Sequence, residues 1–170
     1  YMAYATKLFG FEQLLPMNTG AEGVETSIKL SRKWGYLKKN IEHNKAKIVV
    51  CNNNFHGRTT TVISFSTDSG SKDFFGPNTP GFIHIPHNDI GALEKEFIND
   101  ENIVAFLVEP IQGEAGVNVP DSDYLKKVRE LCTKFNVLMI ADEIQTGLGR
   151  TGSLLASCGN CNCNSSCEQQ

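Results

Sequence analysis

The amino-acid sequence predicts an α/β fold built on a mostly parallel sheet with helices on both faces. Short runs that are apolar at every position alternate along the chain with segments that repeat apolar residues at helical spacing. Strands that are apolar on both faces are typical of parallel sheets covered by helices on both sides. The order strand, helix, strand, helix favours right-handed crossovers in such a sheet.

Three helices are predicted from this pattern. The first follows Thr19, whose hydroxyl can cap it, and runs to Tyr36. The other two open at Asn88-Asp89 and at Asp121-Ser122, and each carries apolar residues at helical spacing. We expect the polar side chains of the first helix to face water; they are Glu25, Lys29, Arg32 and Lys33.

Four short apolar runs predict buried strands. They are Lys47–Cys51, Phe82–Ile85, Ile103–Val108 and Val137–Ala141. A weaker run predicts a further strand over Thr60–Ser66, and Thr67–Gly81 predicts an irregular excursion because Ser, Asp, Gly and Pro dominate it. Ligands of parallel sheets bind outside the carboxyl ends of the strands, so the polar residues that follow these runs are the site candidates.

Composition excludes several classes of function. The chain has 170 residues, of which 40% are apolar and 21% charged, with a net charge of −3, so a disordered chain is excluded. No apolar stretch approaches the ~20 residues that cross a bilayer. Lys and Arg are scattered and the isoelectric point is near 5.8, which leaves no basic surface for nucleic acid. We therefore expect small-molecule partners, without nucleic acid or a membrane.

The six cysteines fall into two groups. Cys51 and Cys132 stand alone in apolar segments, which predicts reduced cysteines that fill the core. The other four crowd into a Cys- and Asn-rich tail over 157–170; they are Cys158, Cys161, Cys163 and Cys167. Four thiolates at this spacing suit zinc or copper, but the ligands are too compressed for a usual two-knuckle site. We interpret the tail as low-complexity sequence and expect no metal site.

An anion site is a candidate at the start of the first helix. Thr19-Gly20-Ala21-Glu22-Gly23 leads directly into it, and backbone N–H groups there can hold a phosphate at the positive end of the helix dipole. The alternative is an ordinary capped turn. The segment matches neither the P-loop nor the G-x-G-x-x-G pattern.

Three carboxylates follow predicted strands. Asp142 comes directly after Val137–Ala141, where a partly desolvated carboxylate needs a partner. It either pairs with a cationic ring nitrogen of a cofactor or serves as a cap or turn residue. Glu109 and Glu114 follow the run Ile103–Val108 and are either a general acid and base or part of a solvated loop.

An aromatic ring, an imidazole and a guanidinium follow the first predicted strand in Phe55-His56-Gly57-Arg58. Phe55 is either a ligand contact or a core residue, and His56 is either a site residue or a surface residue. A lone histidine with no second ligand does not predict a metal site.

Four motifs taken together resemble a known family. They are Asn18–Thr26, Asn54–Thr59, Val108–Val117 and Ala141–Gly152, in this order. The combination resembles the class III aminotransferases, which use pyridoxal 5'-phosphate, nearly without a break over residues 1–156. The resemblance implies that 1–156 form part of the large cofactor-binding domain of a fold-type I enzyme.

The resemblance implies a role for each cofactor-binding position. Gly20 and Ala21 would donate backbone N–H groups to the phosphate, and Phe55 would stack on the pyridine ring. Asp142 would hold the ring nitrogen protonated, as a catalytic residue, because a positive ring makes the cofactor an electron sink. Gln145 would bond the ring hydroxyl.

The resemblance implies three further positions, Glu109 for the cofactor and Arg58 and Glu114 for the substrate. Arg58 resembles the contact to the substrate carboxylate, and Glu109 would lie close to the cofactor pocket. Glu114 resembles a catalytic glutamate that pairs with an arginine further along and moves aside when the 2-oxo acid binds.

The implied activity is transfer of the δ-amino group of L-ornithine to 2-oxoglutarate, which gives L-glutamate 5-semialdehyde and L-glutamate and belongs to proline biosynthesis and arginine metabolism. The alternative amines are acetylornithine and 4-aminobutyrate. The resemblance also implies a homodimer in the cytoplasm, with the mitochondrial matrix as the alternative compartment.

The lysine that carries the family's cofactor lies beyond Gly149-Arg150-Thr151-Gly152. The last lysine of this sequence is Lys134, which is predicted on the polar side of a helix. We therefore expect an interior part of a longer enzyme that is inactive alone; the alternative is a truncated, non-catalytic protein that still binds the cofactor.

Overall fold

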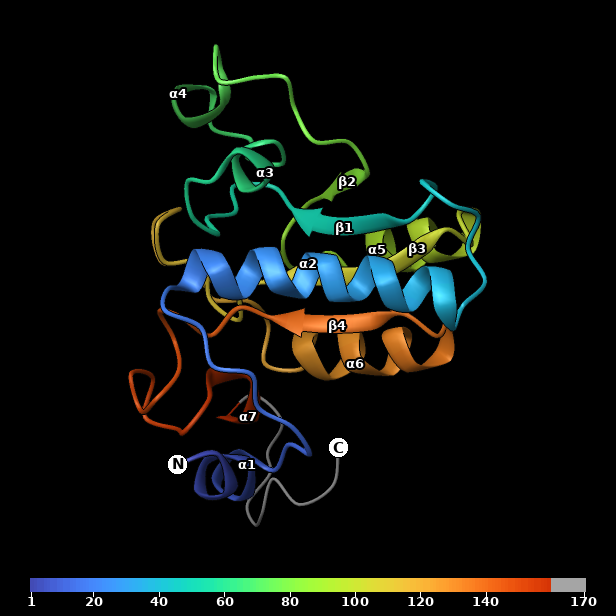
Figure 1. Cartoon of the computed structure of the whole chain (residues 1–170). Helices are drawn as coiled ribbons and strands as arrows, with labels where there is room; N and C mark the ends of the chain where they lie inside the picture. The colour runs from blue at the N-terminus through green and yellow to red at the C-terminus, as the bar shows by residue number, and fades with distance from the viewer. Residues whose placement is uncertain (160–170) are drawn as a thin grey trace.

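A four-stranded, all-parallel sheet forms the centre of the molecule, whose computed structural model describes residues 1–159 (Figure 1). The strand order is β2-β1-β3-β4. The strands are β1 Lys47–Cys51, β2 Phe82–Ile85, β3 Ile103–Val108 and β4 Leu138–Ala141. The predicted parallel sheet is confirmed, and β4 begins one residue later than expected.

The strand register aligns the carboxyl ends of β1, β3 and β4 at one end of the sheet. Val50 pairs with Leu107, and Val108 pairs with Ala141. From β1 the chain moves out to β2 on one side, and from β3 it moves out to β4 on the other. The crevice beyond β1 and β3 is therefore the point at which the strand order reverses, where open α/β sheets bind ligands.

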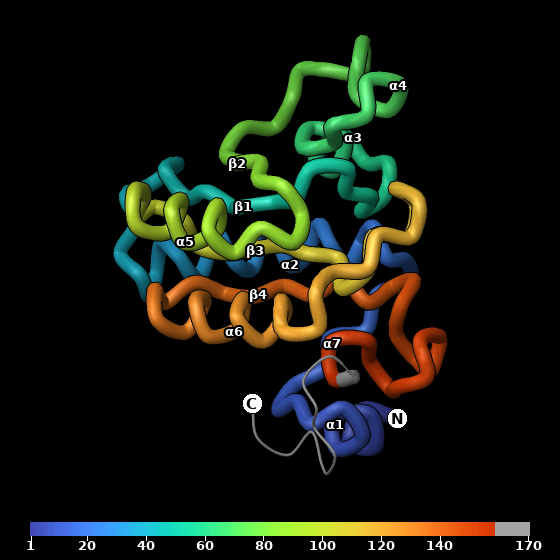
Figure 2. The backbone as a smooth tube through the Cα atoms, turned by 180° about the vertical axis from the view of Figure 1, so that it is seen from behind, coloured from blue at the N-terminus to red at the C-terminus, as the bar shows by residue number. Residues whose placement is uncertain are grey.

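Helices cover both faces of the sheet, as predicted. Helix α2 (Gly20–Leu37) lies across the face seen in Figure 1, and α5 (Ile90–Asn99) and α6 (Tyr124–Lys134) cover the opposite face seen in Figure 2. Each layer buries its own apolar cluster against the strands, and β3 is buried at every position. Cys51 and Cys132 are buried and reduced within the α5/α6 layer, as the sequence predicts.

The starts of α2 and α5 follow the predicted caps. The Thr19 hydroxyl accepts the N–H of Glu22, and the Glu22 carboxylate accepts the N–H of Thr19, so α2 begins with a reciprocal capping box. Asp89 accepts the N–H of Ala92 at the start of α5. Helix α6 begins later than the predicted opening at Asp121-Ser122: its first residue is Tyr124, after a turn at residues 122–123, and its N-cap Asp123 makes no side-chain capping hydrogen bond.

The strand predicted over Thr60–Ser66 is wrong. The chain forms the single-turn helix α3 (Thr60–Ile63), because the Thr59 hydroxyl caps it by accepting the N–H of Val62. Val62, Ile63 and Phe65 are buried, and Val62 and Phe65 join the cluster under α2. Packing of these side chains against α2 outweighs the strand preference of the β-branched residues.

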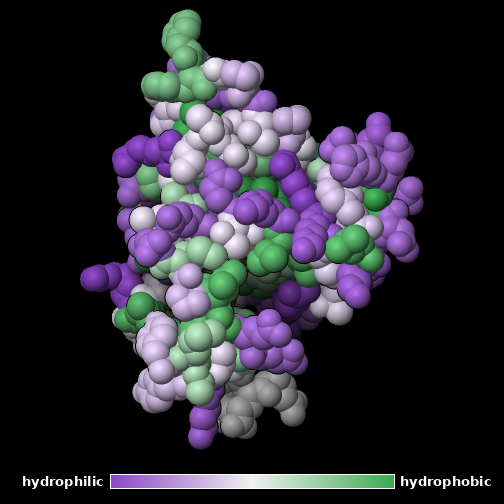
Figure 3. Space-filling view, viewed as in Figure 1, coloured by the Kyte–Doolittle hydropathy of each residue, from purple (hydrophilic) through white to green (hydrophobic). Residues whose placement is uncertain are grey.

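The predicted excursion over Thr67–Gly81 is largely irregular and includes one short helix, α4 (Ser69–Lys72), which Asp68 caps. The excursion projects from the body of the molecule in Figures 1 and 2. Figure 3 shows an apolar projection at the same place, and Phe74 and Phe75 are exposed there.

Two short helices lie outside the predicted pattern. Helix α1 (Met2–Phe9) ends at Gly10, whose φ of 71° is left-handed, and only Ala5 within it is buried. Helix α7 (Ala156–Gly159) is the last described element. Within residues 1–159, no helix is long and apolar enough to cross a membrane.

Two polar side chains of α2 depart from the expectation that they face water. Glu25 is half-buried and accepts a hydrogen bond from Thr59, and Arg32 donates to the carbonyl of Pro80. The Arg32 guanidinium also lies over the ring of Phe82, 5.4 Å from its centre. Lys29 and Lys33 are exposed, as expected.

The prediction about a metal in the tail falls mainly on residues 160–170, which lie outside the described part of the chain. Within the described part, no group of His, Cys, Asp and Glu side chains is arranged to hold a metal ion.

Candidate active site

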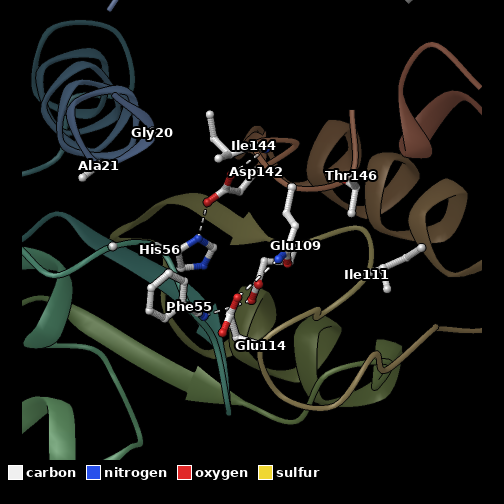
Figure 4. Close-up of a pocket in the computed structure, with 12 residues that line it drawn as sticks. Gly20, Ala21, Phe55, His56, Glu109, Ile111, Glu114, Asp142, Ile144 and Thr146 are labelled. Atoms are coloured by element: carbon white, nitrogen blue, oxygen red, sulfur yellow. Dashed lines mark hydrogen bonds and ion pairs between the residues drawn. The ribbon is translucent and has the colours of Figure 1, made fainter. Parts of the chain in front are cut away.

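A cavity of about 320 Å³ opens at the carboxyl ends of β1, β3 and β4, where the first turn of α2 meets them (Figure 4). Its lining comes from four separate segments: the start of α2 and the segments after three strands. The lining residues are Gly20, Ala21, Phe55, His56, Gly57, Glu109, Ile111, Glu114, Asp142, Ile144, Gln145 and Thr146.

The cavity brings together most of the residues singled out in the sequence. Seven of the eight predicted site residues line it; they are Gly20, Ala21, Phe55, Glu109, Glu114, Asp142 and Gln145. Arg58 does not line it. Its guanidinium carbon lies 5.2 Å from the centre of the Phe55 ring, and its side chain is exposed.

The start of α2 forms an anion-binding end of the cavity. The amides of Gly20 and Ala21 are the first two of the helix, so they have no acceptor within it, and the helix dipole makes this end positive. Gly20 also lies tight against the opposite wall, because a Cβ added there would be 2.9 Å from Cγ1 of Ile144. This geometry suits a phosphate group held by backbone N–H groups.

Asp142 and His56 form a buried pair in the cavity wall. Oδ2 of Asp142 lies 2.6 Å from Nδ1 of His56, and the two side chains are 8% and 0% exposed. A carboxylate only accepts, so this contact suits the His56 tautomer that has its N–H at Nδ1. Oδ1 of Asp142 accepts the N–H of Ile144 at 3.1 Å. Asp142 therefore also stabilises the turn after β4, which was its alternative role in the sequence analysis.

His56 is the residue that the sequence interpretation left least resolved. The surface alternative is wrong, since the side chain is fully buried behind Asp142 and its ring packs 5.9 Å from that of Phe65. Within the described residues, Nε2 of His56 is buried without a hydrogen-bond partner. Its place after β1 marked it as a candidate, but no local pattern connects it with Asp142.

Glu109 is a buried carboxyl in the same wall. Its Oε2 accepts the N–H of Phe55 at 3.1 Å, which joins the segments after β1 and β3 across the crevice. Burial raises the pKa of Glu109 to about 7, with Asp142 and Glu114 adding to the rise and His56 and the Phe55 N–H opposing it. A carboxyl with a pKa near neutral can hold or release a proton at working pH.

Gln145 and Glu114 lie at the exposed rim. Nε2 of Gln145 donates to Oε1 of Glu114 at 3.3 Å. Gly113 is closely approached by the same side chain, because a Cβ added there would overlap Oε1 of Gln145. The loop after β3 and the turn after β4 therefore contact each other at the mouth of the cavity.

The sequence interpretation left His56 open and missed four other lining residues; they are Gly57, Ile111, Ile144 and Thr146. Ile144 lies between Asp142 and Gln145 in one motif, and Gly57 lies between Phe55 and Arg58 in another. Their places inside these motifs were the available signal.

These residues fit pyridoxal 5'-phosphate. One end of the cavity offers free helix amides for a phosphate, and the buried Asp142 carboxylate suits a cationic ring nitrogen. Phe55 supplies an aromatic surface in the same lining (Figure 4). A parallel sheet with this site at its switch point defines the cofactor-binding domain of a fold-type I pyridoxal-phosphate enzyme.

The chain belongs to the class III aminotransferase family, whose model, described as aminotransferase class-III, matches residues 1–160. It is 62% identical over 156 residues to the mitochondrial ornithine aminotransferase of Drosophila melanogaster and 58% identical over 154 residues to the ornithine aminotransferase of Plasmodium falciparum. These alignments cover 92% and 91% of this chain but 36% and 37% of the relatives, so the chain spans a little over a third of their length.

Solved structures give the same family. The crystal structure of ornithine aminotransferase from Toxoplasma gondii superposes with a TM-score of 0.92 at 52% identity, over 94% of this chain and 38% of that one. The acetylornithine aminotransferase of Elizabethkingia anophelis superposes with a TM-score of 0.74 at 51% identity, over 91% of this chain and 34% of that one.

Proposed function

We propose that this chain supplies the cofactor-binding part of an enzyme that transfers the δ-amino group of L-ornithine to 2-oxoglutarate, giving L-glutamate 5-semialdehyde and L-glutamate. The observation that carries the proposal is the cavity that combines the amides of α2 with the buried Asp142. The relatives named ornithine aminotransferase support the choice of amine. In this proposal residues 1–156 belong to the large domain, and 157–170 form a separate tail.

The cavity supports the cofactor-binding roles that we propose. Gly20 and Ala21 bind the phosphate through backbone N–H groups, and Phe55 stacks on the ring. Asp142 holds a proton at the ring nitrogen, and His56 keeps the Asp142 carboxylate oriented through Nδ1. When bound, pyridoxal phosphate supplies an electron sink for the substrate carbanion.

The residues at and beside the rim support the remaining roles that we propose, on the cofactor for Gln145 and Glu109 and on the substrate for Glu114 and Arg58. Gln145 donates to the ring hydroxyl, and Glu114, which contacts Gln145, controls access for the 2-oxo acid. Arg58, held beside the Phe55 ring, binds a substrate carboxylate, and Glu109 holds the backbone of Phe55. Arg58 is charged and exposed outside the cavity wall, and this supports a role in binding a substrate carboxylate there.

The setting is proposed by analogy with the relatives. We propose a homodimer that acts in proline biosynthesis and arginine metabolism. The compartment we propose is the cytoplasm; the name of the Drosophila relative includes the word mitochondrial, so the matrix is the alternative.

The substitution Asp142→Asn tests the proposal. It removes the negative charge beside the ring nitrogen while keeping the shape of the side chain, so the rate of δ-amino transfer should fall by about 10²–10³-fold and the absorbance of the bound cofactor should shift. Steady-state kinetics with L-ornithine and 2-oxoglutarate, on the longer enzyme that contains this chain, measure the rate, and absorbance titration of the same enzyme with pyridoxal phosphate measures the shift.

Asp121→Asn is the matched control, because Asp121 is exposed before α6. It should leave rate and spectrum unchanged. An Asp142→Asn protein as active as the wild type would contradict the role of Asp142, and a higher kcat/KM with acetylornithine than with ornithine would contradict the choice of amine.

A further inference from the structure

The first two turns of α2 contact the segment after β1 at two points. The first contact is between Ala21 and Gly57. Gly57 has a φ of 118°, and a Cβ added there would lie 2.9 Å from Cβ of Ala21. The helix therefore approaches the backbone of this segment as closely as a glycine allows.

The second contact is a hydrogen bond one helical turn further along α2. The Thr59 hydroxyl donates to Oε1 of Glu25 at 2.6 Å, and both residues are half-buried. The same hydroxyl accepts the N–H of Val62 at 3.4 Å and so caps α3. Ala21 and Glu25 are four positions apart, which places both contacts on one face of α2.

These contacts join the two parts of the site that would bind opposite ends of the cofactor. The start of α2 carries Gly20 and Ala21, and the segment after β1 carries Phe55 and His56. Neither Glu25 nor Thr59 belongs to the lining of the cavity. Their hydrogen bond therefore joins the helix that carries the phosphate end to the segment that carries the ring end, and neither side chain lines the cavity itself.

We propose that Glu25 and Thr59 are a pair of positioning residues for pyridoxal phosphate, which hold the phosphate-binding helix start and the ring-binding segment at the spacing that one ligand bridges. The inference rests on the proposed function. A ligand that engages two subsites at once gains affinity from their fixed spacing, whereas a ligand that engages one subsite does not. Loss of the pair should thus weaken the binding of the whole cofactor and leave the binding of pyridoxal or phosphate alone unchanged.

The test compares three ligands on the intact protein: pyridoxal 5'-phosphate, pyridoxal and inorganic phosphate. Thr59→Val removes the hydroxyl at nearly constant shape and should weaken the binding of pyridoxal phosphate by about 5–20-fold, in keeping with one hydrogen bond to a charged group. Binding of pyridoxal and of inorganic phosphate should change by less than about twofold. Titration followed by absorbance, and by calorimetry for phosphate, gives the dissociation constants.

Four further variants separate positioning from folding. Thr59→Ser keeps the hydroxyl and should bind pyridoxal phosphate like the wild type. Glu25→Ala leaves the α3 cap intact and should weaken the binding of pyridoxal phosphate as much as Thr59→Val does. The double variant, Glu25→Ala with Thr59→Val, should bind it no more weakly than either single variant. Thr60→Val makes the same exchange at an exposed neighbour and should change nothing.

Two results would overturn the inference. One is binding of pyridoxal phosphate at wild-type strength by both Thr59→Val and Glu25→Ala. The other is an equal loss for all three ligands, which would indicate a general loss of structure. A wild-type protein that binds no pyridoxal phosphate would overturn the proposed function as well, and this is seen before any variant is compared.

Discussion

Glu109 combines burial with a polar contact to the backbone of Phe55, and both shape its chemistry. Burial raises its pKa from 4.5 to about 7. Between these two values the folded protein keeps a proton on Glu109 that the unfolded chain has released. The folded state then binds more protons than the unfolded state, so this group lowers the free energy of unfolding as pH rises through that window.

The substitution Glu109→Gln should remove this pH dependence. Compared with the wild type, the variant should gain about 1–3 kcal/mol in free energy of unfolding between pH 4.5 and pH 7.5, because it has no carboxylate to charge in a buried place. Urea unfolding at several pH values measures the difference. Glu130→Gln, at an exposed position of α6, should show no such trend, and a Glu109→Gln profile parallel to the wild type would refute the prediction.

Single residues were predictable from sequence where a motif carries them. Gly20 and Asp142 each follow from a local pattern, a helix start in one case and the end of an apolar strand in the other. His56 did not follow, because its partner Asp142 is 86 positions away and the contact exists only when the two loops meet in space. Long-range contacts of this kind leave no trace in local spacing.

Elements were predictable where burial is complete. The run of β3 is apolar at all positions because helices cover both its faces, and the structure places it with the predicted bounds. The helix α3 was not predictable as such, because one turn is too short to show a helical period. Its sequence of Thr, Val and Ile instead resembles a strand, and only the cap from Thr59 and packing under α2 select the helix.

A close approach between α2 and β3 gives a prediction at this scale. A Cβ added to Gly35 would overlap Cγ1 of Val104 near the start of β3, whereas one added to Gly23 would meet no atom within 4 Å. Gly35→Ala should therefore lower the free energy of unfolding by about 1–3 kcal/mol through overpacking. Gly23→Ala should raise it by up to about 1 kcal/mol, because alanine favours the helix.

Chemical denaturation of both variants beside the wild type measures these changes. The two substitutions add the same methyl group to the same helix, so the sign of the effect separates packing from helix propensity. A Gly35→Ala protein at least as stable as the wild type would show that α2 shifts on the sheet to make room.

The whole molecule is layered, and its stability should follow the layers. The two central strands, β1 and β3, are enclosed by both helical layers, while the excursion over 67–81 projects outward with exposed residues. Backbone amides of β1 and β3 should exchange with solvent only on global unfolding, and those of the excursion should exchange by local opening. Hydrogen exchange followed by mass spectrometry distinguishes them, and equal rates in β3 and the excursion would contradict the layered picture.

The order of the strands marks the limit of sequence reasoning for the whole molecule. Alternating apolar runs and helical segments indicate a parallel sheet, but the side of β1 on which each later strand adds depends on packing between distant segments. The cavity forms where the strand order reverses. Its position at the carboxyl ends of the strands could be predicted from the sequence, but which segments line it together could not.

The parallel pairing of β1 with β3 also bears on how fast the site comes into existence. Lys47 pairs with Ile103, so the crevice closes only after a long stretch of chain has been brought together, which is slow for parallel sheets. A cofactor that contacts both the start of α2 and the carboxyl ends of β1, β3 and β4 has no binding site before that step. It should therefore lengthen the lifetime of the native state without accelerating its formation.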